Sequence, residues 1–172
     1  MHEAIFWRGV FIHRYAGMEH TLSELLLRLG AHEAYKGFGE LPYPWAKKLS
    51  RLSAILDAPG PVRDYADWMR RALTPLTSAE RQRHLLVHGM MSLGLRREEP
   101  RTLFFKTHDW IKGDLGEITM WITIDDLRGM TDEVGEHVRD FVRGVAELFE
   151  KLDLAPIAVS DLEALDTAAR KI

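Results

Sequence analysis

The residues that could do chemistry gather in one short segment, RHLLVHG at positions 83–89. It contains Arg83, His84 and His88, and Arg81 stands two residues before Arg83. An imidazole exchanges protons near neutral pH and binds metal ions, whereas a guanidinium group binds carboxylates and phosphates. Three interpretations of the segment are therefore open: an ordinary turn of a buried helix, half of a metal site, or a catalytic pair.

The spacing of these residues decides which of them can act together on a helix. Arg81, His84 and His88 are three and four residues apart, so they form one stripe. Arg83 and His88 are five apart, which places them about 140° apart on an ideal helix. Three arrangements would let Arg83 and His88 act on one target. The long arginine side chain wraps round the helix, the helix distorts near Gly89, or a second copy of the motif completes the site. The last option predicts a symmetric dimer in which the two motif helices meet at the axis.

A metal site is the main alternative from a different chemical class. His84 and His88, at positions i and i+4, can both ligate one ion. His13 and His20 are seven residues apart on the first predicted helix, and Glu24 continues the same face. Against this interpretation, no second histidine–carboxylate motif marks a dinuclear site, and the neighbouring arginines repel a cation.

The segment is predicted to lie on the fourth of several helices. Apolar residues spaced by three and four predict a long helix over about 3–35, and Gly37 and Gly39 end it. A second helix starts near Pro44, and DAPGP at 57–61 separates it from a third. Pro75 is predicted to stop the third helix. The fourth, capped by Thr77 or Ser78, continues past Gly89 and Gly94 until RREEP at 96–100 closes it. The buried stripe expected in the first helix consists of Phe11, Tyr15, Met18, Leu22, Leu25 and Leu29.

After residue 100 the apolar period changes from that of a helix to that of a strand. In EITMWITI at 117–124, isoleucine and methionine alternate with threonine and tryptophan, which predicts a strand. TLFFKTHDW at 102–110 predicts its partner, and KGDLG at 112–116 supplies the turn. The result is a β-hairpin over about 101–124, which must pack against the helices or a partner because an isolated hairpin is marginally stable. Its aromatic side chains have two interpretations, base stacking and burial against the helices, of which we expect burial: Phe104, Phe105 and Trp121.

A last long helix is predicted to start at Asp125 or Asp126, either of which can cap it. Its apolar stripe consists of Leu127, Met130, Val134, Val138, Phe141, Val145, Leu148 and Leu152. The tail over about 155–172 is expected to be weakly structured. The chain is thus predicted to be one mainly helical domain spanning 1–172. Its architecture is a four- to five-helix up-and-down bundle with one β-hairpin between the fourth and fifth helices.

Composition excludes several classes of protein. The chain has 172 residues, a formal net charge of −3 and no cysteine. Disulfides, thiolate metal sites and cysteine nucleophiles are therefore excluded. The protein also lacks the excess of basic residues that would bind nucleic acid through net charge alone. No stretch approaches the length of a membrane span. We expect a soluble cytoplasmic protein with no membrane partner.

The motif in its helical context resembles the signature of HEPN domains. These are helical-bundle proteins of toxin–antitoxin and other defence systems, and many are metal-independent ribonucleases. Their motif is an arginine followed, after four to six residues, by a histidine. Arg83, the residues HLLV and His88 match it at the shortest spacing, and His84 stands where asparagine or aspartate is commoner. The resemblance in helix order covers roughly residues 3–152, the motif only 83–88, and the hairpin is a departure.

The resemblance implies an RNA-binding, metal-independent endoribonuclease that needs no cofactor. Its active site would be shared by the two protomers of a homodimer, and a cognate antitoxin would be a further partner. His88 would be the general base or acid, because an unperturbed imidazole pKa of about 6.5 suits both roles. Arg83 would hold the phosphate, His84 would support it or share proton transfer, and Arg81 would bind substrate. Two alternatives stay open: a catalytically inactive HEPN-like binding or regulatory module, and a histidine-ligated metal enzyme built on a helical bundle.

Overall fold

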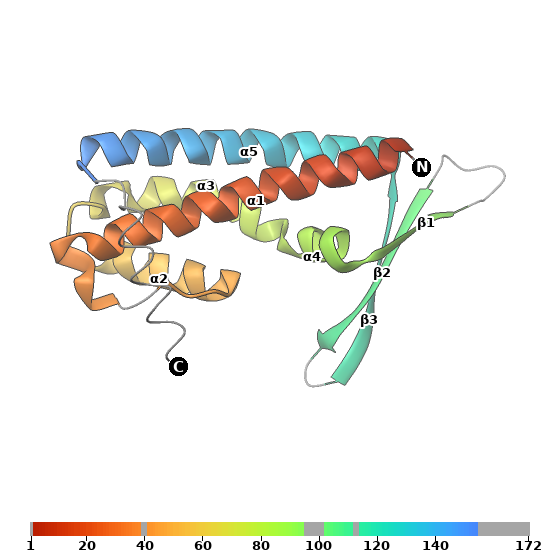
Figure 1. The fold of residues 1–172 in the computed structure, drawn as a ribbon, viewed down its shortest axis with the longest axis horizontal. Helices are drawn as coiled ribbons and strands as arrows, with labels where there is room; N and C mark the ends of the chain where they lie inside the picture. Colours follow the sequence, from red (N-terminus) through yellow and green to blue (C-terminus); the bar gives the residue numbers. More distant parts are fainter. Residues whose placement is uncertain (1, 39–40, 95–101, 112–113, 155–172) are drawn as a thin grey trace, which may run out of the picture. The chain divides into compact units, whose positions relative to one another are not determined.

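A computed structural model describes residues 2–38, 41–94, 102–111 and 114–154 (Figure 1). These residues are mainly helical, as predicted, and the expected hairpin lies between the fourth and fifth α-helices. Residues 112–113 of the predicted turn, the RREEP segment at 96–100 and the tail at 155–172 lie outside the described residues, and residues 114–116 of that turn belong to a strand. Within the described residues no helix is long and apolar enough to cross a membrane. The elements are α1 (His2–Ala31), η1 (Glu33–Phe38), α2 (Trp45–Asp57), η2 (Arg63–Tyr65), α3 (Ala66–Ser78), α4 (Glu80–His88), β1 (Met90–Gly94), β2 (Thr102–Ile111), β3 (Asp114–Thr123) and α5 (Ile124–Lys151).

The chain divides into two compact units. The first contains Met1–Met18 and Met69–Phe141, and the second contains Glu19–Trp68 and Val142–Ile172. The long helices α1 and α5 each contribute residues to both units. The RHLLVHG segment and the three strands belong to the first unit.

The predicted apolar stripes form the cores of both units. All six stripe residues of α1 are buried: Phe11, Tyr15, Met18, Leu22, Leu25 and Leu29. In α5 the buried stripe residues are Leu127, Val134, Val138, Phe141, Val145 and Leu148, while Met130 and Leu152 are partly exposed. The three- and four-residue spacing therefore identified the buried side of each long helix correctly.

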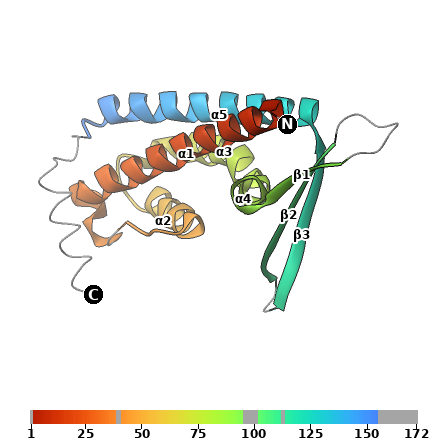
Figure 2. The same ribbon diagram turned by 45° about the vertical axis from the view of Figure 1, so that its right-hand side comes forward.

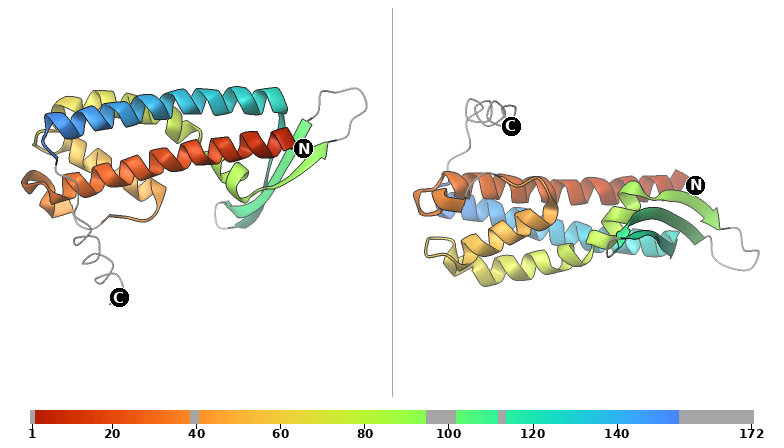
Figure 3. Two further views of the ribbon diagram at one scale, coloured as in Figure 1. Left: turned by 45° about the horizontal axis from the view of Figure 1, so that its top comes forward. Right: turned by 90° about the horizontal axis from the view of Figure 1, so that it is seen from below.

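In the first unit the N-terminal parts of α1 and α5 lie side by side (Figure 3). Arg14 joins them, because its Nη1 donates to the carbonyl oxygen of Thr131 at 2.6 Å and to the Asp132 carboxylate at 3.0 Å. Gly135 makes room for this guanidinium, since a Cβ there would lie 2.5 Å from Nη1. The pairing explains why a charged residue stands beside the buried stripe of α1.

The sheet is antiparallel, with β2 in the middle, and has one strand more than predicted (Figure 2). The prediction that the fourth helix continues past Gly94 is wrong, because α4 ends at His88 and residues 90–94 form β1. Gly89 turns the chain with extended dihedral angles, and Met90 then pairs with Lys106. The edge of β2 offers backbone partners to this short apolar run, which outweighs its weak helical pattern.

Two predicted helix boundaries are also wrong. Pro75 does not stop α3, which continues through it to Ser78. Proline lacks the N–H that would otherwise bond to the carbonyl of Arg71, so the helix continues with one backbone hydrogen bond fewer. Thr77 and Ser78 do not cap α4, because their hydroxyls donate to carbonyls one turn earlier within α3.

The start of α5 is capped by a residue other than the predicted aspartates. The Thr123 hydroxyl accepts the backbone N–H of Asp126 at 3.0 Å and donates to its carboxylate at 2.6 Å. Thr123 is therefore the cap, and Asp126 is the acidic partner three residues later. This reciprocal pair fixes the junction between β3 and α5.

The second unit is held by two large aromatic side chains over glycines. The α1 helix ends at Ala31, earlier than predicted, and η1 places Tyr35 in the core. The Tyr35 hydroxyl accepts the backbone N–H of Val62 at 3.1 Å, and Gly60 stands beside it with a φ of +156°. In the same unit Trp68 covers Gly144, where an added Cβ would lie 2.0 Å from the indole ring.

Candidate functional site

The helix α4 carries all four residues that the sequence singled out. Its buried side is formed by Leu85 and Leu86, which hold the helix in the first unit. Arg81 and His88 are exposed, whereas Arg83 and His84 are partly buried. One short helix therefore presents its ionisable residues in two different environments.

The two histidines of the segment are brought together. Their ring centroids are 4.9 Å apart, with an angle of 51° between the ring planes. Arg81 is exposed one turn before His84, as the predicted stripe requires. Of the two adjacent imidazoles, His88 is exposed at the end of α4, whereas His84 is partly buried one turn earlier, with its Nε2 atom out of contact with solvent. Two adjacent imidazoles can both accept and donate a proton.

Arg83 has a different environment, formed by Glu80 and Tyr15. The Arg83 Nε and Nη2 atoms donate to the two carboxylate oxygens of Glu80 at 3.1 and 2.7 Å. The guanidinium carbon lies 5.6 Å from the centre of the Tyr15 ring, and only 20% of the Arg83 side chain is exposed. The structure therefore brings His84 and His88 together and places the Arg83 guanidinium on Glu80 and Tyr15.

Tyr15 connects this ion pair to the core of the first unit. The residue is 1% exposed, and its hydroxyl lies 2.7 Å from the Glu80 carboxylate and 3.1 Å from the carbonyl oxygen of Leu76. Glu80 is thus fixed from one side by a buried phenol and from the other by Arg83. Its spacing of three residues before Arg83 was a local signal that could have predicted this pair.

Arg8 is a further residue of the site that the sequence patterns did not reveal. Its Nε donates to the carbonyl oxygen of Leu86 at 2.6 Å, and its Nη2 donates to those of Val87 at 3.3 Å and Gly89 at 3.1 Å. These groups surround His88 at the end of α4, where backbone carbonyls lack helical partners and a positive charge is favoured. Because 78 residues or more separate Arg8 from these groups, no local pattern could have revealed it.

The metal interpretation finds no ligand set in the part of the chain that the structure describes. No group of three or more histidine, cysteine, aspartate or glutamate residues that could hold an ion occurs among these residues. His84 and His88 adjoin each other. His13 belongs to the first unit, whereas His20 and Glu24 belong to the second.

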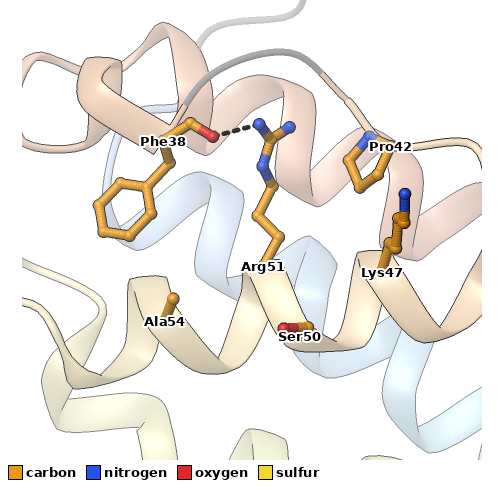
Figure 4. A pocket seen from close by; sticks show the side chains of 6 residues that line it. All are labelled: Phe38, Pro42, Lys47, Ser50, Arg51 and Ala54. Atoms are coloured by element: carbon orange, nitrogen blue, oxygen red, sulfur yellow. Dashed lines mark hydrogen bonds between the residues drawn. The ribbon is translucent and has the colours of Figure 1, made fainter.

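A hollow in the second unit is separate from these residues. It has a volume of about 350 Å³ and is open to solvent, and Lys47, Ser50 and Arg51 of α2 line one side of it (Figure 4). The Arg51 guanidinium donates to the carbonyl oxygen of Phe38 across the hollow. The four residues of α4 that the sequence singled out do not line it.

The chain was compared with protein-family models, curated proteins and solved structures, and none of the three comparisons gave a match.

Proposed function

We propose that this chain is a HEPN-like RNA-binding protein that cleaves RNA without a metal ion, as a homodimer with a helical-bundle core. The observation that carries the proposal is the contact between the exposed His88, at the end of α4, and the partly buried His84 one turn before it. Two imidazoles within one site supply both the base and the acid that cleavage of RNA requires. A toxin or defence role, with a cognate antitoxin as partner, follows from the same resemblance.

The reaction needs no external nucleophile, because RNA carries one in its 2′-hydroxyl. One imidazole removes the 2′-hydroxyl proton while the 2′-oxygen forms a bond to the adjacent phosphorus. The bond from phosphorus to the 5′-oxygen breaks, and the second histidine, as imidazolium, protonates that oxygen. The products are a 2′,3′-cyclic phosphate and a 5′-hydroxyl end, and the two histidines have exchanged protonation states.

The arginines take different parts in this proposal. Arg81 is exposed on the histidine stripe, so it meets the RNA backbone directly. Arg83 must exchange its Glu80 carboxylate for a phosphate, or share both, to stabilise charge in the transition state. A second protomer that brings its own α4 to the axis supplies the remaining cationic groups, which is the reason for proposing a homodimer.

The test is RNA cleavage in EDTA by wild type, His88→Ala and His84→Ala. His13→Ala is the matched control, because His13 is also an exposed histidine of the first unit. The proposal expects cyclic phosphate ends from wild type and the control, and a loss of at least a hundredfold in His88→Ala, the usual size of a general acid–base contribution. Equal rates in wild type and His88→Ala, or no cleavage of varied RNAs, would overturn the proposed chemistry.

A second candidate is a HEPN-like binding or regulatory module without catalysis. The ion pair of Arg83 with Glu80 favours it, because a guanidinium already neutralised by a carboxylate is a structural group in many helices. This candidate expects RNA or protein binding that survives His88→Ala, together with no cleavage by wild type. A binding assay run beside the cleavage assay therefore separates the two candidates.

A further inference from the structure

The two faces of the sheet are buried to different extents. One face carries Leu103, Phe105 and Thr107 of β2, which are all buried, so the predicted burial of Phe105 is confirmed. The opposite face carries Phe104, which is partly buried, and Trp121, which is 58% exposed. The prediction that Trp121 is buried is therefore wrong. The exposed indole belongs to β3, an outer strand of the sheet.

The strand β3 carries apolar side chains on both of its faces and is fully buried on neither. On the face that carries Phe105, Ile118, Met120 and Ile122 pair with buried residues of β2 but are themselves only partly buried. On the other face Leu115 is 65% exposed, in addition to the exposed Trp121. A side chain in a sheet is covered partly by its neighbours on both adjacent strands. An apolar outer strand would therefore gain burial from a further strand beside it.

The outer edge of β3 is also open along its backbone. Every second residue of an outer strand directs its N–H and C=O groups away from the neighbouring strand. Among the described residues, none outside β2 bonds to the backbone of β3 from Leu115 to Trp121. The strand contains no lysine, arginine or proline, and its pairing with β2 from Asp114 to Thr123 is uninterrupted. It thus lacks most of the features with which outer strands usually prevent pairing with another strand.

A second copy of β3 fits this edge, because the strand is complementary to itself. Two copies related by a two-fold axis pair in antiparallel fashion, and each residue must be opposite one on the same face. Two registers meet this condition and pair nearly the whole strand, with the axis at Ile118 or at Thr119. With the axis at Ile118, Leu115 of each copy is opposite Trp121 of the other, so the exposed apolar residues cover each other. With the axis at Thr119, Glu117 would be opposite that indole instead.

The charged residues on the face that carries Trp121 also favour the axis at Ile118. Glu117 of each copy is then opposite Thr119 of the other, so no two like charges are directly opposite each other. Within its own copy, Glu117 forms an ion pair with Lys106, which is opposite Thr119 in the pairing of β2 with β3. The carboxylate beside the interface is therefore already paired with a cation.

We infer that two copies of this chain pair in antiparallel fashion through β3, about a two-fold axis at Ile118, so that their sheets become one continuous sheet. The inference deepens the proposed function, on which it rests for the homodimer, by naming the surface that joins the copies. The Arg8 guanidinium carbon lies 5.8 Å from the centre of the Phe105 ring, and Arg8 bonds to carbonyls at the end of α4, so this end lies on the face that carries Phe105. Because the axis is perpendicular to the sheet, both α4 helices then lie on the same side of the continuous sheet.

Disulfide cross-linking tests the register, because the chain contains no cysteine of its own. Directly opposite residues on antiparallel strands are about 4.5–5.5 Å apart at Cα, within reach of a disulfide, whereas residues displaced by two positions are not. Ile118→Cys should therefore form covalent dimers with itself in oxidised glutathione, as seen on non-reducing gels. Leu115→Cys and Trp121→Cys should do so only when mixed with each other. Met90→Cys is the matched control and should form none, because Met90 is exposed on the same face but lies on β1, the other outer strand.

Sedimentation equilibrium measures the strength of the association. Thr119→Glu places a carboxylate opposite Glu117 of the other copy, twice by symmetry, while Lys106 of its own copy compensates the new charge within the sheet. The dimer should weaken roughly 2- to 30-fold, since each unfavourable pair contributes about 0.2–1 kcal/mol. Adding Glu117→Lys to this variant should restore the affinity. Met90→Glu is the matched control and should leave the dimer unchanged, because Met90 is also opposite Lys106 but at the other edge of the sheet.

Three results would overturn the inference. The first is wild type that sediments only as a monomer. The second is a dimer in which Ile118→Cys does not cross-link, because the copies would then meet at another surface or in another register. The third is equal affinity of wild type and Thr119→Glu for a second copy. Failure here is distinct from failure of the proposed chemistry, because the chain could cleave RNA without pairing through β3, or pair through β3 without cleaving RNA.

Discussion

Replacing Arg8 by methionine should destabilise the protein by about 3 kcal/mol. The change keeps most of the apolar length of the side chain and removes the guanidinium that binds the end of α4. The bonds to Leu86 and Gly89, at 2.6 and 3.1 Å, are the well-formed pair, while that to Val87 is longer at 3.3 Å. Hydrogen bonds to charged groups contribute about 1.5–3 kcal/mol each, and the partly exposed position of Arg8 favours the lower value for both.

Urea unfolding followed by circular dichroism measures this free energy of unfolding. The m-value should be unchanged, because the folded and unfolded states expose nearly the same surface as in wild type. Arg81→Met is the matched control, since it removes the same charge from an exposed position on α4 itself. It should change the free energy of unfolding by no more than about 0.5 kcal/mol.

The same variant tests whether Arg8 positions His88 for the proposed reaction. If it does, Arg8→Met lowers the kcat of RNA cleavage and leaves KM nearly unchanged, because the variant disturbs the histidine more than the RNA contacts. Arg8→Met and Arg81→Met with equal unfolding free energies would refute the reasoning. That outcome would mean that water replaces the guanidinium on these carbonyls at no net cost.

Three further predictions concern contacts described above. Gly144→Ala should destabilise the protein by about 1–3 kcal/mol in urea unfolding, because the new methyl group displaces Trp68. Gly129→Ala, at an open position of the same helix, is its control. Thr123→Ala should cost about 1 kcal/mol in the same assay through loss of the α5 cap, and Thr123→Ser should restore most of it. Glu80→Gln should tighten RNA binding severalfold at low salt by releasing Arg83, and unchanged affinity would show that Glu80 does not compete with phosphate.

Sequence periodicity predicted the long elements well because their burial repeats many times. Tyr15 and Leu22 in α1, and Phe141 in α5, occupy positions at which only one side of a helix meets the core. The hairpin was predicted equally well, because apolar and polar residues alternate over several positions in its two strands. Each of these elements carries its own pattern, so no knowledge of distant residues was needed.

The short elements depended on distant residues and were predicted poorly. The run Met90–Gly94 has too few residues to show a period, and it becomes β1 because β2 accepts it as a partner. Pro75 lies within α3, and its carbonyl oxygen accepts the N–H of Ala79, which the local sequence does not indicate. Boundaries of this kind follow from tertiary surroundings rather than from propensity.

In the candidate site, too, the local spacing was predicted from the sequence and the contacts between distant residues were not. The spacing of His84 and His88 correctly predicted that they adjoin, because both lie on one regular helix. Arg83 lies beside Tyr15, which is on α1 and 65 residues before Glu80 in the chain. The carbonyl groups around His88 accept hydrogen bonds from Arg8, which is also on α1. These contacts decide the environment of the arginine and the end of the helix, and they exist only once the chain is folded.

The direct junction between α4 and β1 restricts how the length of this segment can change. Gly89 is the single residue between His88 and Met90, and a Cβ there would lie 2.3 Å from the carbonyl oxygen of Leu85. Because strand residues alternate between faces, inserting one residue at the junction would turn every side chain of β1 to the wrong side of the sheet. An insertion of two would keep the alternation but separate His88 from the strand pairing. The length of this junction is therefore subject to a parity rule, whereas an ordinary surface loop tolerates insertions of any size.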